Sequence, residues 1–265
     1  HQEAKKHNMI QLASIVHDLK TPLNCIQGTI NIIKLLVEQQ PGLVQYMKNI
    51  LVIAAHPDDE TLGLGGTLAL YSQRGYKISA LIFADGESSR QKGNNINMRK
   101  TQAKKACVCL DIENPIFLDY EDQKLEKTSL IDLANQIEKY ISKIKPEIIF
   151  THFWGDVNQD HRRIFEATQI ATRPLPDASI KKIICYETPS STEWGLESFN
   201  PNFFVKIDKT IKKKMKAVNC YKNEIRKSPH PRSTESIIIR SQYWGNVVGV
   251  NHAESFIVLR EIDKD

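Results

Sequence analysis

The stretch "ILVIAAHPDDETLGLGG", residues 50–66, decides the fold of this 265-residue chain. Six apolar residues run directly into a histidine, a proline and three consecutive acids. The apolar run is typical of a strand that is buried on both faces, because such a strand has no polar positions. The acids then lie where the strand ends, and we expect a positively charged group against them.

Short apolar runs and helical patterns alternate along the rest of the chain. The predicted strands cover residues 50–55, 78–83, 115–118, 148–151 and 183–186. The predicted helices between them cover residues 61–73, 98–110, 129–144 and 164–172. This alternation predicts an α/β fold, with a Rossmann-like, mostly parallel sheet and flanking helices.

Residues 1–46 follow a different pattern. Their apolar residues recur alternately three and four positions apart from Met9 to Val37, which is a heptad seam, and Pro41 and Gly42 end it. We predict an N-terminal amphipathic helix, residues 1–46, ahead of an α/β domain, residues 47–265. Because one helix cannot bury this seam alone, it must pack on the α/β domain or on a second copy of itself, and we favour a homo-oligomer formed through it.

Composition and charge exclude several classes of partner. The formal net charge is +5, and the densest basic run, at residues 212–214 and 216, is interpreted as the solvated face of a helix. No aromatic residues interleave with it, so we expect no nucleic-acid partner. The apolar stretch at residues 29–37 is too short to cross a bilayer, so we expect no membrane span. Five scattered cysteines without a signal peptide favour the cytoplasm.

Ligand-type side chains follow two of the predicted strands. His56 and Asp59 are three residues apart on a turn fixed by Pro57, so both can reach one cation. The turn after the strand at 148–151 carries Asp156, Asn158, Asp160 and His161. Ligands of open parallel sheets bind at the carboxyl ends of the strands, where these two groups should meet.

A mixed set of His56, Asp59 and His161 suits zinc with an open position for water. Bound zinc lowers the pKa of its water towards neutrality, and Asp58 is placed to take the proton. Alternatively, the acids of this stretch cap the helix that follows, where its N-terminal dipole favours negative charge. The second polar cluster weakens the capping interpretation without excluding it.

Two other ligand sites fit the sequence poorly. The segment "DVNQDHRRIFEA", residues 156–167, has the outline of a calcium loop, but His161 stands at the invariant glycine and Ala167 at the terminal glutamate. The glycines of residues 63–66 fail the spacing of a dinucleotide fingerprint, and three acids beside them would repel a pyrophosphate. We therefore expect neither calcium nor a dinucleotide.

The segments "AHPDDE", residues 55–60, and "GDVNQDHR", residues 155–162, resemble the PIG-L/LmbE-like family of zinc-dependent N-deacetylases. The resemblance extends through "FADGESSR", "NMRKTQAKKA", "FLDYEDQKL", "YETPSSTEW", "SPHPRS" and "GVNHAESFIVLR", and covers nearly all of residues 47–265. It implies a zinc-dependent hydrolase that removes an N-acetyl group from an N-acetylglucosamine-type amino sugar or its conjugate.

The resemblance also implies roles for individual residues. His56, Asp59 and His161 would be the zinc ligands and Asp58 the general base, in agreement with the interpretation of their spacing. Asp160 would act in catalysis by orienting a histidine; its alternative is a plain helix cap.

Other implied roles concern the substrate. Arg99 and Arg232 would hold substrate oxygens, although Arg99 equally fits a solvated helix arginine. Many family members have a histidine where this chain has Asn158, whose amide can donate a hydrogen bond to the substrate but cannot supply a proton. His230 or His252 would then be the general acid, or else a structural loop histidine.

The segment "SIVHDLKTPLNCIQG", residues 14–28, resembles the phosphoacceptor helix of sensor histidine kinases. His17 lies beside the heptad seam, where phosphate could reach it. The chain contains no second hairpin helix and no ATP-binding domain, so we favour a helix without a catalytic role. The alternative function is a signalling fusion protein whose α/β domain only binds a ligand, and stoichiometric zinc would separate the two hypotheses.

Overall fold

The computed structural model describes residues 48–90, 95–176 and 178–263. The helix predicted for residues 1–46 lies outside these ranges, together with His17 and the expected self-association. The domain boundary before Met47 therefore stays a prediction. None of the described helices is long and apolar enough to span a membrane.

Seven strands of the described chain form one sheet in the order β3-β2-β1-β4-β5-β7-β6. Strands β1 to β5 are parallel, whereas β7 runs antiparallel to both β5 and β6. The strands are β1 (Asn49–Ala54), β2 (Lys77–Ala84), β3 (Ile116–Tyr120), β4 (Ile148–His152), β5 (Lys182–Tyr186), β6 (Phe203–Lys206) and β7 (Ala253–Glu261). The predicted α/β fold with a mostly parallel sheet is confirmed.

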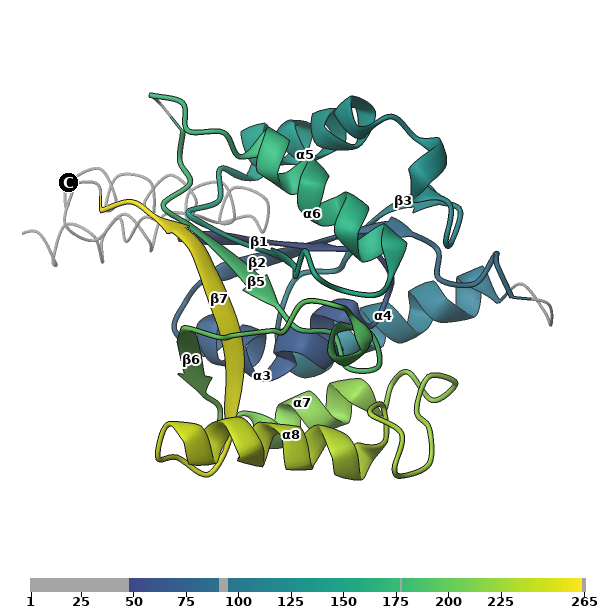
Figure 1. Ribbon diagram of the computed structural model, residues 1–265, viewed down its shortest axis with the longest axis vertical. Coiled ribbons are helices and arrows are strands. Elements are labelled where there is room, and N and C mark those ends of the chain that lie inside the picture. The colour runs from purple at the N-terminus through teal and green to yellow at the C-terminus, as the bar shows by residue number, and fades with distance from the viewer. Residues whose placement is uncertain (1–47, 91–94, 177, 264–265) are drawn as a thin grey trace, which may run out of the picture. The chain divides into compact units, whose positions relative to one another are not determined.

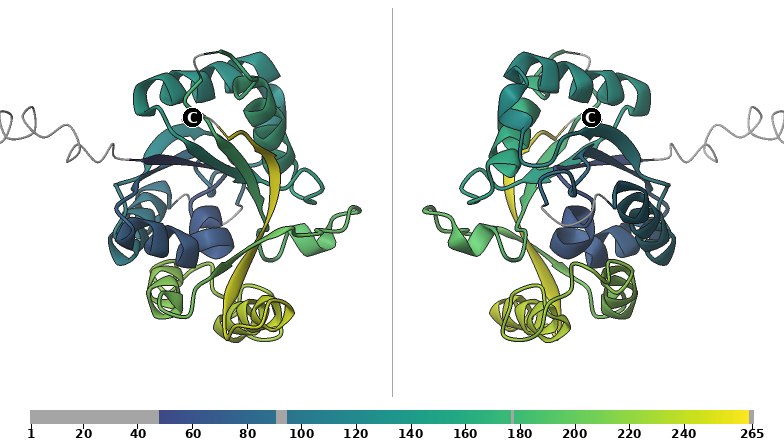
Figure 2. Two further views of the ribbon diagram at one scale, coloured as in Figure 1. Left: turned by 90° about the vertical axis from the view of Figure 1, so that its left-hand side faces the viewer. Right: turned by 90° about the vertical axis from the view of Figure 1, so that its right-hand side faces the viewer.

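Helices cover both faces of the sheet (Figures 1 and 2). On one face lie α5 (Leu130–Ile144) and α6 (Gln159–Ala171), and on the other lie α3 (Asp59–Gln73), α4 (Ile96–Leu110) and α7 (Ile211–Val218). The helix α8 (Thr234–Val247) packs against β7, and two short 3₁₀ turns, Leu125–Lys127 and Thr192–Trp194, lie in loops.

Strand β1 shows why the chain folds into three layers. Ile50 and Val52 enter the core beneath α3 and α4, whereas Leu51 and Ile53 enter the core beneath α5 and α6. All four side chains are fully buried. Because successive side chains of a strand point to opposite faces, a continuous apolar run supplies both cores at once.

Helix α3 is kinked at Leu64, and a buried ion pair between Lys214 and Glu254 binds backbone groups at the kink. Leu64 has φ −141° and ψ 18°, which are not helical angles. Lys214 Nζ donates to the carbonyl of Leu62 at 2.8 Å, while Glu254 accepts from the backbone of Gly66 at 2.9 Å. The ammonium and carboxylate groups are themselves 2.6 Å apart. The pair thus satisfies backbone groups that the kink frees.

This contact corrects the interpretation of the basic run at residues 212–216. Lys214 is 4% exposed, so it belongs to the inner face of α7 rather than to the solvated one. Sequence periodicity alone does not show that the Lys214 ammonium group pairs with the buried carboxylate of Glu254 on β7.

We predict that Lys214→Met lowers the free energy of unfolding by about 3–5 kcal/mol, because it leaves Glu254 buried without its cation and the Leu62 carbonyl without its donor. Chemical denaturation measures the loss. The control is Lys213→Met, whose partner Asp111 is exposed, and which should change stability by less than about 1 kcal/mol. Equal effects of the two substitutions would contradict the role of the buried pair.

Candidate active site

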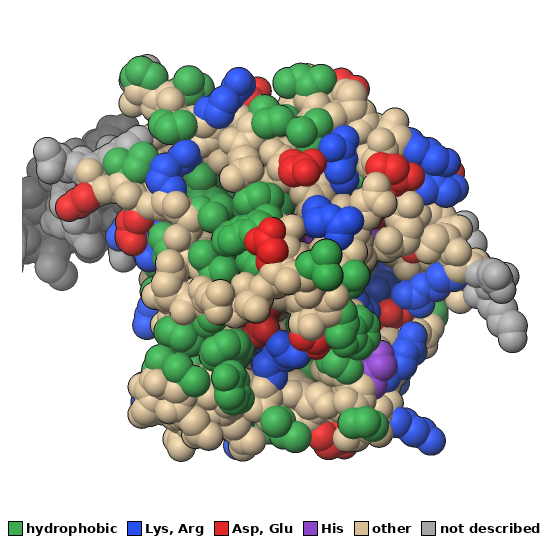
Figure 3. Space-filling model, viewed as in Figure 1, with side chains coloured by type: hydrophobic (Ala, Val, Ile, Leu, Met, Phe, Trp, Pro, Cys, Tyr) green, Lys and Arg blue, Asp and Glu red, His purple; other side chains and the backbone are tan. Residues whose placement is uncertain are grey.

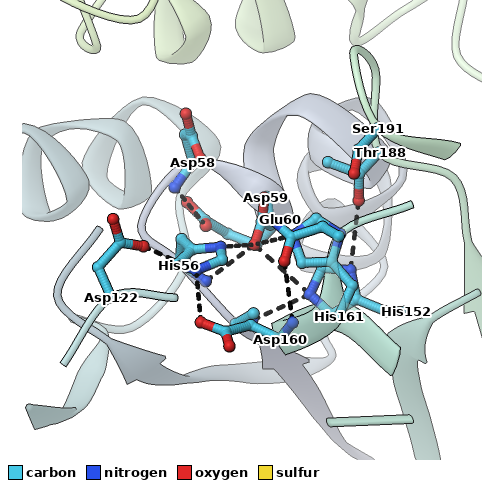
Figure 4. Close-up of polar contacts among 12 residues, drawn as sticks. His56, Asp58, Asp59, Glu60, Asp122, His152, Asp160, His161, Thr188 and Ser191 are labelled. Atoms are coloured by element: carbon cyan, nitrogen blue, oxygen red, sulfur yellow. Dashed lines mark hydrogen bonds and ion pairs between the residues drawn. The ribbon is translucent and has the colours of Figure 1, made fainter. Parts of the chain in front are cut away.

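The site lies at the carboxyl ends of β1 and β4, where the strand order of the sheet reverses. Chain segments leaving neighbouring strands diverge at such a point and open a crevice. His56 and Asp59 follow β1, whereas Asp160 and His161 stand at the start of α6 after β4. Figure 4 shows these side chains converging from the two strand ends. The predicted meeting of the two clusters is therefore seen in the structure.

The turn after β1 adopts an unusual backbone conformation at Asp58. Its φ angle is 119°, in a region that side chains other than glycine rarely adopt and that costs about 1–3 kcal/mol. Glu60 supports the turn by accepting a hydrogen bond from the Asp58 N–H at 3.1 Å. The conformation places adjacent acids in different surroundings: Asp59 among histidines and Asp58 against arginines.

Asp59 is the centre of the site. Its Oδ2 lies 3.3 Å from both His56 Nδ1 and His161 Nε2, and it accepts the His56 backbone N–H at 2.8 Å. Among the described residues, its Oδ1 has no hydrogen-bond partner although it is buried. One ligand atom from each of the three residues lies within 4.8 Å of the others. This arrangement could hold a metal ion, which would also satisfy the unpartnered oxygen.

Carboxylates on the far side of each histidine fix the ring orientations. Asp160 Oδ2 and Asp122 Oδ1 lie 3.2 and 3.1 Å from His56 Nε2. Asp156 Oδ2 lies 3.1 Å from His161 Nδ1. His56 Nδ1 and His161 Nε2 are then the nitrogens directed towards Asp59, as expected for metal-binding histidines with supporting carboxylates. Asp160 thus lies where its predicted orienting role requires.

A second acidic group around His56 could also hold an ion, and it consists of His56, Asp122 and Asp160. Its oxygens, however, already have partners. Asp160 accepts backbone N–H groups of Gln123 at 2.9 Å and Leu125 at 3.2 Å, and Asp122 accepts the hydroxyl of Ser89. The group around Asp59 therefore offers the more available ligand atoms.

The carboxylates change the proton affinity of both histidines. Burial favours neutral His56, but hydrogen bonds to Asp122, Asp160 and Asp59 outweigh it and raise its pKa well above the ordinary value. For His161, burial is likewise outweighed by Asp59 and Asp156, which raise its pKa to about 9. A metal ion would therefore have to displace protons from this site.

His152, at the end of β4, was not identified from the sequence as a site residue. Its Nε2 lies 3.4 Å from Asp59 Oδ2 and accepts the backbone N–H of Ala55 at 2.9 Å. Its ring stacks on His161 with centroids 3.9 Å apart. Burial and the nearby His161 lower the pKa of His152 well below the ordinary value. The lone pair of His152 Nε2 accepts the Ala55 N–H and is not available to a metal ion. Neutral His152 therefore joins the end of β1 to β4, and its ring packs against His161.

Asp58 is held by a cluster of arginines. Its Oδ2 lies 3.0 Å from Arg99 Nη2 and 3.1 Å from Arg232 Nη1. Both guanidinium groups also contact Glu224, at 2.7 and 3.2 Å, and Glu224 accepts two bonds from Arg90. Arg99 is only 2% exposed, which excludes the alternative of a solvated helix arginine.

The two carboxylate oxygens of Asp58 differ in their contacts. Asp58 Oδ1 is buried and has no hydrogen-bond partner within the described part of the chain. Burial raises the pKa of Asp58, although Arg99 and Arg232 oppose this shift. The carboxylate thus combines one anchored oxygen with one unpartnered oxygen, which suits a proton acceptor.

The remaining predicted residues lie at different distances from the metal-binding side chains. Asn158 caps α6, because its Oδ1 accepts the N–H of Asp160 at 2.9 Å. Because Asn158 is the N-cap residue of α6, the alternative in which Asp160 is only a helix cap is excluded. His230 accepts the backbone N–H of Arg232 at 3.1 Å, beside the arginine cluster. His252 contacts the Ser241 hydroxyl of α8 at 2.9 Å, which suits a structural histidine.

Comparisons with known proteins relate this chain to deacetylases. A family model described as PIG-L, GlcNAc-PI de-N-acetylase, matches residues 51–172, which include the residues that converge on Asp59. The uncharacterized deacetylase YaiS of Escherichia coli (strain K12) is 33% identical over 165 residues, which are 60% of this chain and 82% of that protein.

Two further proteins match over longer parts of the chain. The diacetylchitobiose deacetylase of Thermococcus kodakarensis is 23% identical over 220 residues, 78% of this chain and 82% of that protein. The crystal structure of a conserved protein from Thermus thermophilus has a TM-score of 0.68 and 25% identity, covering 83% of this chain and 98% of that one.

The raised pKa of His161 gives a test of the site around Asp59. Below a pKa of about 9 metal-free His161 holds a proton, and His56, whose pKa is also raised well above the ordinary value, holds another. We therefore predict that zinc affinity still rises between pH 7 and 8.5, by about tenfold per pH unit for each proton displaced and by up to about a hundredfold for the two. Ordinary histidines are already neutral there. Competition with a chelator measures the affinity, and an affinity that is constant over this range would contradict the proton displacement.

Proposed function

The chain belongs to the PIG-L family of deacetylases, and we propose that it hydrolyses the acetamide of an N-acetylglucosamine-type sugar or conjugate with Zn²⁺ in the site around Asp59. The products are acetate and the free amine. One observation carries the proposal: a buried Asp59 between two histidine nitrogens, next to an Asp58 oxygen without a partner in the described chain.

We assign the zinc to His56, Asp59 and His161. The set combines two imidazole nitrogens and one carboxylate, which is typical of catalytic zinc sites with three protein ligands. When bound there, zinc supplies a Lewis acid for the acetamide carbonyl and lowers the pKa of a water molecule. Asp122, Asp156 and Asp160 keep the rings oriented, and buried surroundings limit competing water.

Asp58 is the proposed general base. Its anchored oxygen keeps the carboxylate in place through Arg99 and Arg232, while Oδ1 accepts a proton from the attacking water. The same carboxylic acid then returns the proton to the departing nitrogen, so the proton balance of hydrolysis closes on one residue. Asp160 contributes by orienting His56. His230, which lies beside the arginine cluster, is the alternative acid for this last proton transfer.

The arginines and Asn158 are the proposed substrate contacts. Arg232 is 19% exposed at its side chain, so its guanidinium group can reach substrate oxygens from the rim of the site. Arg99 is buried behind Asp58 and acts on the substrate through it. Asn158 uses its oxygen for the helix cap, which leaves its amide N–H groups to donate. A cytoplasmic location rests on the sequence alone.

We predict that Asp58→Asn keeps zinc, because His56, Asp59 and His161 are unchanged, but lowers kcat by about a hundredfold or more through loss of the base. Metal analysis and release of free amine measure the two effects. The matched comparison is Glu224→Gln, which removes a carboxylate from the same arginines but no base, and should cost less than about tenfold. Similar losses in both variants would mean that Asp58 acts only by neutralising arginines.

The substrate class is tested with a panel of N-acetylated sugars and conjugates, incubated with zinc-loaded protein and assayed for free amine. We expect release from at least one N-acetylglucosamine derivative and none after zinc removal. Stoichiometric zinc without hydrolysis of any acetamide would overturn the proposed reaction. Absence of zinc binding altogether would instead favour the signalling hypothesis, in which the α/β domain only binds a ligand.

A further inference from the structure

The proposed reaction gives no role to Tyr221, a buried residue whose hydroxyl points towards the turn after β1. Tyr221 begins the loop between α7 and α8. The outer side of this loop is basic: Lys222 and Lys227 are exposed, and Figure 3 shows Lys and Arg side chains over this part of the molecule, at the lower right of the view. Tyr221, in contrast, is only 2% exposed, and its side chain enters the protein.

Tyr221 contacts the turn through Glu60. The Tyr221 hydroxyl donates to Glu60 Oε1 at 2.7 Å, and Glu60 Oε2 accepts the Asp58 N–H at 3.1 Å. The Thr61 hydroxyl also donates to Oε1, at 2.8 Å. Thr61 is the chain neighbour of Glu60, whereas Tyr221 lies 161 residues away in sequence. Tyr221 therefore ties the Glu60 carboxylate to a distant part of the fold.

The backbone of Asp58 depends on support of this kind. Its φ angle of 119° is unfavourable for a residue with a side chain and persists only where the surroundings impose it. The start of α3 fixes the carbonyl group of Asp58, which accepts the N–H groups of Thr61 at 3.0 Å and Leu62 at 2.8 Å. Glu60 fixes the amide group of Asp58. The direction of the Asp58 side chain thus depends on where Glu60 is held.

The ring of Tyr221 contacts a second support of Asp58, the side chain of Arg99. Arg99 Nη2 lies 3.0 Å from Asp58 Oδ2, and the guanidinium carbon lies 5.5 Å from the centroid of the Tyr221 ring. The negative face of an aromatic ring attracts such a cation. The Tyr221 carbonyl also accepts the N–H of Glu224 at 2.8 Å, and Glu224 Oε1 lies 2.7 Å from Arg99 Nη1. Tyr221 therefore contacts supports of both the backbone and the side chain of Asp58.

Packing explains the ring of Tyr221 but does not explain its hydroxyl. The ring belongs to the apolar core beneath α3 and α4, where a phenylalanine ring would pack in the same way. A buried tyrosine hydroxyl needs a hydrogen-bond partner, and here the partner is the same carboxylate that binds the Asp58 N–H. Removal of the hydroxyl alone therefore separates the two contributions.

We propose that Tyr221 is a positioning residue for the general base. Through Glu60 and Arg99 it holds Asp58 in the orientation in which Oδ1 accepts the proton of the attacking water. The inference rests on the proposed deacetylation and adds to it a residue outside the segment 51–172 that the family model matches. Tyr221 acts through these two residues and not on the substrate.

Steady-state kinetics of zinc-loaded Tyr221→Phe test the proposal, with the N-acetylated sugar that the wild type hydrolyses fastest. Because the base is displaced but the ligands His56, Asp59 and His161 are unchanged, we expect kcat to fall about tenfold, KM to change by less than about twofold and zinc to stay stoichiometric. The matched control is Tyr71→Phe, which removes a hydroxyl from an 8% exposed tyrosine of the same core near the other end of α3 and should leave kcat unchanged.

A double-mutant cycle with Asp58→Asn distinguishes positioning from a general structural role. Where the base is absent its orientation no longer matters, so Tyr221→Phe should lower the residual kcat of Asp58→Asn by less than about twofold. A further loss as large as that in the wild-type background would overturn the proposal.

Glu60→Gln is a second variant for the same cycle, and it keeps the proposal testable if Tyr221→Phe does not fold. It replaces one carboxylate oxygen with an amide nitrogen, so either the Asp58 N–H or the Tyr221 hydroxyl faces a donor instead of an acceptor. We expect a lower kcat in the wild-type background and no further loss in Asp58→Asn. Equal losses in the two backgrounds would contradict the link through Glu60.

The remaining outcomes separate this role from the reaction itself. If the wild type releases no amine from any N-acetylated sugar, the proposed deacetylation fails, and the role of Tyr221 fails with it. If the wild type is active and Tyr221→Phe keeps its full kcat, the reaction stands and only the positioning role is overturned. Loss of zinc from Tyr221→Phe would also overturn it, because Tyr221 would then support the metal ligands instead of the base.

Discussion

The site depends on one buried carboxylate, Asp59, which has no exposed surface and is in contact with two histidines. A buried charge is costly unless a cation compensates it. In the metal-free protein, protons on His56 and His161 provide that compensation. Asp122 and Asp160, together with Asp59, raise the pKa of His56, and Asp59 and Asp156 raise that of His161. A zinc ion would replace these protons and would also satisfy the unpartnered Asp59 oxygen. The consecutive acids after β1 therefore lie against positive charge: Asp59 contacts the two histidines, and Asp58 contacts two arginines.

The sheet positions the residues around Asp59, and the adjacent acids Asp58 and Asp59 have different surroundings. Strand ends β1 and β4 deliver the residues around Asp59, while Asp122 and Asp156 come from the loops that follow β3 and β4. The strained backbone at Asp58 turns this carboxylate away from the histidines and towards the arginine cluster. Two adjacent acids consequently have opposite environments: Asp59, whose pKa is held low chiefly by His161 against the effect of burial, and Asp58, whose pKa is raised by burial.

Much of this arrangement could be predicted from the sequence, for physical reasons. Strands β1, β2, β4 and β5 are buried on both faces and leave apolar runs, and the half-buried edge strand β3 still carries three apolar residues in a row. All five parallel strands are therefore predictable, and the motifs at the ends of β1 and β4 indicate the ligands. The secondary structure of the last third of the chain is harder to predict. Strand β6 has only four residues, and α8 exposes the apolar side chains of Ile239, Tyr243 and Val247, so the apolar residues of α8 do not mark one buried face. Burial of Lys214 and the support from His152 depend on partners about 40 and 97 residues away in sequence. Spacing cannot reveal which histidine nitrogen faces which acid.

The most direct measurement is a crystal structure of zinc-loaded protein with anomalous diffraction at the zinc edge. Two groups of ligand atoms share His56, whose Nδ1 faces Asp59 and whose Nε2 faces Asp122 and Asp160, so the position of the ion distinguishes them. We predict one strong peak within about 2.0–2.2 Å of His56 Nδ1, Asp59 and His161 Nε2. A peak between His56 Nε2, Asp122 and Asp160, or no ordered zinc near Asp59, would contradict the account.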